Sequence, residues 1–166
     1  VCLVGSEMCI RDRLHTFSNT DFDKTLDLSF KMLWLSLKCE IQYLTEQSLT
    51  ASIVNISSNA ALRGYANNSI YAASKAAVNS LTLSAAKELG KKNIRINAIS
   101  PGTILTPGVE NYFKQEPNAE DYLKSSILLN RIGTPEDIGN AVSFLLSEDS
   151  KYIHGPVSYT HLTLPT

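Results

Sequence analysis

The apolar residues between positions 22 and 46 recur at intervals of three and four. They are Leu26, Phe30, Leu33, Leu37 and Ile41. This interval places them on one face, so we expect a long amphipathic helix here. Thr20, followed three residues later by Asp23, supplies a hydroxyl cap and an acid near its start. A second helix is predicted over residues 69–89, which are rich in Ala, Leu and Lys, lack Pro and Gly, and end at Gly90.

Each of these helices is followed by a short run rich in β-branched residues. The runs are residues 52–57 and 94–100, and both are typical of buried strands in a parallel sheet. Pro101 and Gly102 close the second run. The segment 106–130 is polar, and we expect two short helices in it.

A third long helix is predicted to begin at Thr134 and to run to about residue 147. Thr134 is a capping residue, Pro135 suits the first helical position, and two acids follow in the first turn. The order helix, strand, helix, strand, helix indicates an α/β fold with a doubly wound parallel sheet. Two strands cannot form such a sheet alone, so we expect the chain to lack strands before residue 14 and after residue 156.

Both ends of the chain are predicted to be foreign to the native protein. The DNA sequence AGATGTGTATAAGAGACAG, read from its third base, can encode residues 8–13. Its reverse complement, read in the same way, encodes residues 157–162. An adapter inserted at both ends of a DNA fragment leaves such a pair, and segments of this kind are set aside before the fold is considered. We therefore expect residues 1–13 and 157–166 to be artefacts and residues 14–156 to be native.

Composition supports one globular domain. The 166 residues are 43% hydrophobic and 19% charged, with a net charge of -1, so no broad basic field is present to attract nucleic acid or an anionic membrane. No apolar run approaches the roughly 20 residues that span a bilayer. The three cysteines and the histidines have no metal-site spacing, and only Cys39 lies outside the suspect ends. We expect a soluble, cytoplasmic protein without a metal, a nucleic-acid partner or a membrane partner.

Ser58, Tyr71 and Lys75 are the candidate catalytic residues. Ser58 follows the first predicted strand, at the sheet edge where α/β proteins bind ligands. Tyr71 and Lys75 are four residues apart in a predicted helix and therefore share a face. An ammonium near a phenol favours the phenolate and lowers the tyrosine pKa from about 10 toward the working pH, as a general acid or base requires. A Tyr-x-x-x-Lys pair alone is weak evidence, and a surface pair is the alternative.

Several motifs together resemble the short-chain dehydrogenase/reductase family. They are the runs 53–58, 71–77, 93–102, 131–138 and 152–155 and the thirteen-residue interval from Ser58 to Tyr71. The resemblance covers residues 20–155. It implies the catalytic, carboxyl-terminal half of a Rossmann-type domain, with its N-terminal βαβ units and last strand missing. It also implies an NAD- or NADP-dependent oxidoreductase that interconverts a small-molecule alcohol and a ketone by hydride transfer.

The resemblance assigns a role to each of the three catalytic candidates. Tyr71 would move the hydroxyl proton, and Ser58 would hydrogen-bond the substrate oxygen and stabilise the charge that develops there. Lys75 would bind the nicotinamide ribose hydroxyls together with Tyr71.

The same resemblance assigns cofactor binding to the turn after the second predicted strand. Pro101 and Gly102 would bring the backbone close to the nicotinamide carboxamide, which the backbone of Ile104 and the hydroxyl of Thr106 would contact. A helix cap is an equally good interpretation of Thr106.

Two departures from the family pattern matter. Ser29 occupies the slot where the family carries an Asn that maintains a water-linked proton relay with the lysine. A serine there keeps one donor and acceptor but is shorter, so the relay would need a further water or a shifted route. The Gly-rich phosphate-binding turn is absent, because it belongs to the family's first βαβ units. The sequence therefore does not distinguish NAD from NADP.

Three functional interpretations remain open. The first is the oxidoreductase, which in this family implies a homo-oligomer. The second is a catalytically silent relative that works by subunit association or ligand binding. The third is a truncated product without function, which would bind nicotinamide cofactor poorly and expose an unpaired sheet edge.

Overall fold

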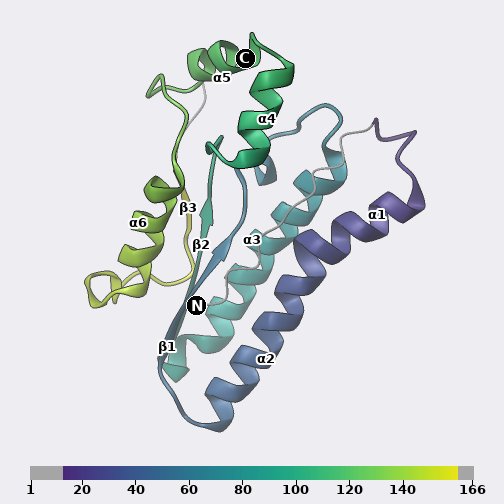
Figure 1. Ribbon diagram of the computed structural model, residues 1–166. Helices are drawn as coiled ribbons and strands as arrows, with labels where there is room; N and C mark the ends of the chain where they lie inside the picture. Colours follow the sequence, from purple (N-terminus) through teal and green to yellow (C-terminus); the bar gives the residue numbers. More distant parts are fainter. Residues whose placement is uncertain (1–12, 161–166) are drawn as a thin grey trace.

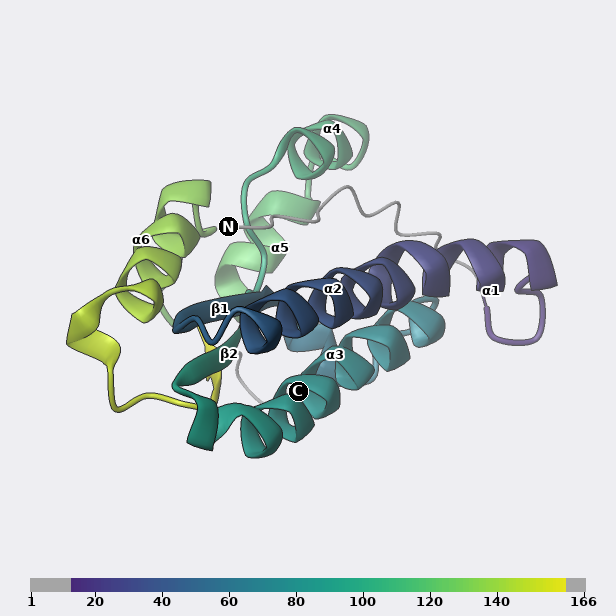
Figure 2. The ribbon, with the colours of Figure 1, turned by 90° about the horizontal axis from the view of Figure 1, so that it is seen from below.

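The structure is a computed structural model that describes residues 13–160. In chain order its longer elements are α1 (Asn19–Leu26), α2 (Met32–Glu46), β1 (Ala51–Ile56), α3 (Ser69–Leu89), β2 (Ile94–Ser100), α4 (Pro107–Gln115), α5 (Ala119–Ser126), α6 (Pro135–Leu146) and β3 (Val157–Tyr159). The strands form one parallel sheet in the order β1-β2-β3. Helices α2 and α3 cover one face and α6 lies on the other (Figures 1 and 2). This arrangement confirms the predicted α/β class.

The two predicted strands form the core pair of the sheet. β1 and β2 pair in parallel from Ala51 opposite Ile94 to Ile56 opposite Ile99, within one residue of the predicted bounds. The main buried cluster lies between this pair and the two helices on its face. Its members are Leu37, Ala85, Ala86, Leu89, Ile94 and Ile96. The carboxyl ends of both strands therefore meet at one edge of the sheet, beside the first turns of α3.

The third strand, β3, was not predicted, and the expectation that the last strand is missing is wrong for these three residues. The N–H of Gly155 donates to Ile96 O at 2.9 Å, and that of Ala98 donates to Pro156 O at 3.1 Å. These bonds bring the chain beside β2, whose outer backbone groups pair with any extended segment. β3 lies in the segment 157–166, whose foreign origin remains a prediction. Residues 1–12 and 161–166 of the two predicted artefact segments lie outside the described part.

The helical region before β1 is continuous but begins earlier than predicted. Ser18, rather than Thr20, caps α1: its hydroxyl accepts from the Asp21 N–H at 3.1 Å and donates to the Asp21 carboxylate at 2.7 Å. Between α1 and α2 the segment Asp27–Lys31 forms a π-helical turn, which the apolar spacing did not indicate. Such turns are rare and occur often at functional sites.

The predicted end of α3 at Leu89 is confirmed. Gly90 was expected to end the helix, but it does not adopt the left-handed backbone that is usual for a glycine in this position. Gly90 has a right-handed backbone (φ −54°), and the left-handed residue is Asn93 (φ 55°), after a short 3₁₀ turn. A Cβ on Gly90 would lie 3.3 Å from Nε2 of His154. The glycine therefore makes room for a packed imidazole rather than supplying an unusual φ.

The polar segment 106–130 contains the two short helices expected, α4 and α5. The last predicted helix, α6, starts with the expected capping box: Thr134 Oγ1 accepts from the Asp137 N–H, and the Asp137 carboxylate accepts from the Thr134 N–H. Among the described residues, no helix is long and apolar enough to cross a membrane.

Candidate active site at the carboxyl edge of the sheet

Ser58 lies two residues after the end of β1, in an extended conformation (φ −157°, ψ 153°). Its Oγ accepts a hydrogen bond from the Ala60 N–H at 3.2 Å and so caps the 3₁₀ turn Asn59–Ala61. A serine hydroxyl has one proton and two lone pairs, so accepting this bond leaves its O–H able to donate.

Tyr71 and Lys75 lie in the first two turns of α3. The Lys75 side chain is buried, with 3% of its surface exposed, and its Nζ lies 5.8 Å from the centroid of the Tyr71 ring. The ammonium donates to Ile56 O, at the end of β1, over 3.1 Å. The Ile56 carbonyl and the Tyr71 ring thus face the ammonium in place of the water that it loses on burial.

The end of β1 is fastened to α3 at the level of Lys75. The hydroxyl of Ser57, which is 3% exposed, donates to the backbone carbonyl of Lys75 at 3.0 Å. Ser74 donates to Tyr71 O at 2.7 Å. The structure thus brings Ser58, Tyr71 and Lys75 to one end of the β1 and α3 pair, although they come from two elements.

Ser29 comes from a different element, the helical stretch that packs against α3. It is buried (6% exposed) in the π-helical turn Asp27–Lys31, which packs against α3. One turn earlier, the Thr25 hydroxyl is also buried and has no hydrogen-bond partner among the described residues. The face of this helix toward α3 is therefore polar at two successive turns. Thr25 was not singled out by sequence reasoning, because an isolated threonine in a helix carries no functional signal.

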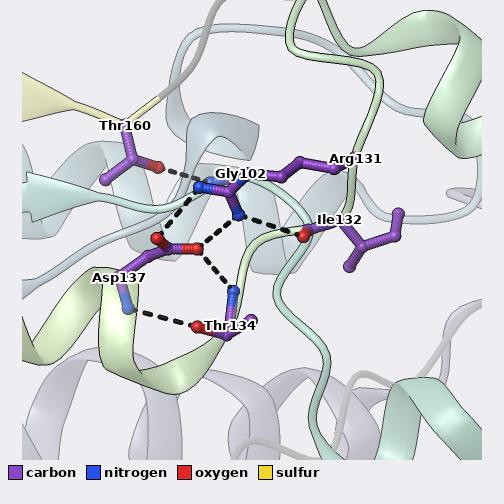
Figure 3. Close-up of polar contacts among 6 residues, drawn as sticks. All are labelled: Gly102, Arg131, Ile132, Thr134, Asp137 and Thr160. Atoms are coloured by element: carbon purple, nitrogen blue, oxygen red, sulfur yellow. Dashed lines mark hydrogen bonds and ion pairs between the residues drawn. The ribbon is translucent and has the colours of Figure 1, made fainter.

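The Pro101–Thr106 turn leaves β2 at the same edge. Asn59 N–H donates to Pro101 O at 2.8 Å, which ties the turn to the segment after Ser58. Gly102 N–H donates to Thr160 Oγ1 at 3.2 Å (Figure 3). Thr106 caps α4, since its Oγ1 accepts from the Val109 N–H at 3.4 Å; its O–H can still donate outward.

Ile104 forms an isolated parallel bridge with Gly133. Leu105 N–H donates to Gly133 O at 2.8 Å, and Gly133 N–H donates to Thr103 O at 3.0 Å. In a parallel bridge of this pattern the N–H and C=O of the central residue point to the opposite side. The backbone of Ile104 therefore presents one donor and one acceptor away from Gly133, the set that a primary amide matches.

A polar network surrounds Gly133 that sequence reasoning found only in part. Arg131 donates to both carboxylate oxygens of Asp137, at 2.6 and 3.0 Å, while Asp137 also accepts from the Thr134 N–H at 2.8 Å (Figure 3). Arg131, and then the Thr134 N–H, hold the pKa of the Asp137 carboxyl well below its ordinary value. The sequence predicted the capping box, but it did not indicate that Arg131, six residues earlier in a loop, would pair with Asp137. In the described part of the chain, no cluster of three or more His, Cys, Asp or Glu residues has a metal-site arrangement.

Comparisons with known proteins agree with this geometry. Residues 3–161 match a family model described as Enoyl-(Acyl carrier protein) reductase. The human (3R)-3-hydroxyacyl-CoA dehydrogenase is 39% identical over 138 residues, which are 83% of this chain and 52% of that protein. The 3-oxoacyl-[acyl-carrier-protein] reductase FabG of Thermotoga maritima is 36% identical over 156 residues, 93% of this chain and 62% of that protein.

Solved structures agree as well. ElxO with NADP bound superposes with a TM-score of 0.87 at 30% identity, covering 94% of this chain and 63% of that one. 4-Hydroxyisoleucine dehydrogenase complexed with NADH gives a TM-score of 0.88 at 30% identity, covering 93% and 63%. The chain spans about half the length of the first curated relatives it matches. With its motifs, its fold and these matches, the chain belongs to the short-chain dehydrogenase/reductase family.

Proposed function

We propose that the chain is the catalytic half of an NAD(P)-dependent oxidoreductase that interconverts an alcohol and a ketone. The observation that carries the proposal is the buried ammonium of Lys75, fixed beside the Tyr71 ring at the sheet edge where Ser58 lies. A lysine is almost never buried without a partner, and the charge here is placed beside a phenol. That combination suits proton transfer to and from a hydroxyl group.

The three side chains divide the work. The Tyr71 hydroxyl gives its proton to the substrate oxygen in reduction and takes it back in oxidation. The Ser58 hydroxyl, one of whose lone pairs accepts from the Ala60 N–H, donates to the same oxygen and stabilises its developing negative charge. The Lys75 ammonium favours the ionised form of the Tyr71 phenol. When bound, the nicotinamide supplies or accepts the hydride.

The residues present fit a nicotinamide cofactor. The backbone of Ile104 offers an outward donor and acceptor for the carboxamide, fixed by the bridge to Gly133. Lys75 and Tyr71 would bind the ribose hydroxyls, as the family pattern implies. The structural relatives named above carry NADP or NADH, and we propose NAD or NADP for this protein. Pro101 and Gly102 form the turn that brings this backbone to the edge of the sheet.

The names of the relatives favour a carbonyl and hydroxyl substrate pair. The curated ones are a 3-hydroxyacyl dehydrogenase and a 3-oxoacyl reductase. The family model's description names an enoyl reductase, which reduces a carbon–carbon double bond. Hydride addition to either substrate places negative charge on a carbonyl oxygen that a serine and a tyrosine hydroxyl can stabilise. The choice of the alcohol and ketone pair therefore rests on the names of the curated relatives.

Turnover of the full-length enzyme tests the proposal. Replacing Tyr71→Phe removes the transferable proton and is expected to lower kcat by about 10²-fold or more. Tyr43→Phe is the matched control, because Tyr43 is 59% exposed on α2, and it should leave kcat unchanged. Retained turnover in the Tyr71 variant would refute the assigned mechanism, whereas absence of turnover in the unaltered full-length enzyme would favour the silent relative.

We propose a homo-oligomer and a cytoplasmic location for the full-length protein. Large apolar side chains remain exposed along the helices on one face of the sheet. They include Leu28, Met32 and Leu35 on the first helical stretch and Leu83 on α3, each between 41% and 47% exposed. A second subunit on this face would remove them from water.

A further inference from the structure

We propose that the ion pair between Arg131 and Asp137 is a positioning clamp for the nicotinamide carboxamide. It acts through Gly133 on the backbone of Ile104. The inference rests on the proposed function and adds two residues to the site, neither of which touches the cofactor.

The pair closes a short loop around Gly133. Residues 131 and 137 lie on either side of it, and two parallel N–H···O bonds of 2.6 and 3.0 Å join them (Figure 3). The same carboxylate accepts from the Thr134 N–H at 2.8 Å. One carboxylate thus fixes the backbone before and after Gly133. A forked contact of this kind specifies geometry as well as attraction.

Gly133 passes that restraint to the cofactor segment. It accepts from the Leu105 N–H and donates to Thr103 O, so both flanks of Ile104 are held by a single residue. The approach is close: a Cβ on Gly133 would lie 2.6 Å from Ile104 Cδ1 and 3.4 Å from Thr103 O. Any rotation of the Gly133 peptides therefore turns the N–H and C=O of Ile104.

Stability alone does not account for this arrangement. Arg131 and Asp137 are 52% and 38% exposed, and exposed pairs contribute little to folding. The capping box needs only the Asp137 carboxylate and Thr134. Neither folding stability nor the capping box requires the Arg131 guanidinium, yet it binds both carboxylate oxygens of Asp137. Its evident effect is to orient the carboxylate and with it the Gly133 loop.

The test compares two ligands in the full-length enzyme. NAD(P)H contains the nicotinamide, and ADP-ribose or its 2′-phosphate lacks it. Asp137→Asn retains an acceptor for the Thr134 N–H but loses the charge, and Arg131→Lys retains the charge but loses the fork. Each is expected to raise the Kd of NAD(P)H about tenfold, as for one misplaced hydrogen-bonded group, and to leave the Kd of the ligand without nicotinamide unchanged.

Lys31→Gln is the control, because it breaks another exposed ion pair, with Asp27 at 2.9 Å, far from the turn. It should change neither Kd. Hydrogen exchange of the chain gives an independent readout: the Leu105 and Gly133 amides should exchange faster in both clamp variants and normally in the control.

If the clamp variants raise the Kd of both ligands equally, or of neither, the clamp is wrong. Turnover by the unaltered full-length enzyme would still support the proposed function in that case. If the unaltered full-length protein binds no nicotinamide cofactor, the proposed function and the clamp both fail. Faster exchange at Leu105 would then report a structural role only.

Discussion

The residue that departs most from the usual preferences of a folded chain is Lys75. Its ammonium lies almost wholly out of water, 3.1 Å from Ile56 O and 5.8 Å from the Tyr71 ring centroid. Burying a charge costs stability unless partners compensate for it. No folding requirement explains a lysine at this position, because an apolar side chain of the same length would fill the space. We therefore attribute the buried charge of Lys75 to function, since active sites often sacrifice stability for activity.

Replacing Lys75→Met tests that interpretation. The variant keeps the length of the side chain and removes the charge, so the free energy of unfolding should stay within about 1 kcal/mol of the original or rise. Lys75→Ala, which leaves a cavity, should cost about 2 kcal/mol or more. Urea denaturation of the chain measures both. A large loss in the methionine variant would show that the charge serves the fold.

At the scale of elements, the sequence predicted what short-range physics decides. Hydrophobic spacing located the helical stretch from α1 to α2 as one helix, composition located α3, and β-branched runs located β1 and β2 to within one residue. Thr134 with Asp137 marked the start of α6, because periodicity and capping are local. The π-helical turn at Ser29 and the bridge between Ile104 and Gly133 could not be predicted, since each depends on contacts between distant segments. The candidate trio was predicted through motif spacing, whereas the forked pair of Arg131 was not.

The start of α6 is expected to be sensitive to acid. Arg131 and the Thr134 N–H hold the pKa of Asp137 well below its ordinary value of 3.8. A lowered folded-state pKa adds stability that is complete above the unfolded value and is lost as pH falls through the folded one. The Tm difference between the original chain and Asp137→Asn should be constant from pH 7 to about 5 and shrink below about 4. A difference that persists unchanged at the acid limit would contradict the assigned pairing.

At the scale of the whole molecule, the sheet is open along β1. Within residues 13–160, β1 pairs with β2 alone, and a groove of about 280 Å³ runs beside it, between α2 and α6. Its lining includes Leu33, Leu37, Val54 and Val142. An unpaired edge next to an apolar groove is a template for strand addition. The chain covers only about half of its first curated relatives, which have further chain available to pair there.

We expect the isolated chain to self-associate through β1. Val54→Lys places a charge in the groove and should lower the sedimentation coefficient at high protein concentration toward that of a monomer. Leu35→Lys, on the exposed face of α2, is the comparison. If only the α2 variant dissociates the chain, association uses the helical face and the edge prediction is wrong.

Deuterium labelling tests most directly whether the enzyme transfers a hydride from the nicotinamide cofactor to a ketone. The full-length enzyme is supplied with a ketone and with a reduced nicotinamide cofactor deuterated at its hydride-bearing ring carbon, and the product is analysed by NMR. We predict deuterium on the carbinol carbon of an alcohol, and about 10²-fold less of it from the Tyr71→Phe variant. Absence of deuterium from the carbinol carbon, or equal labelling by both proteins, would contradict an alcohol and ketone oxidoreductase built on Ser58, Tyr71 and Lys75.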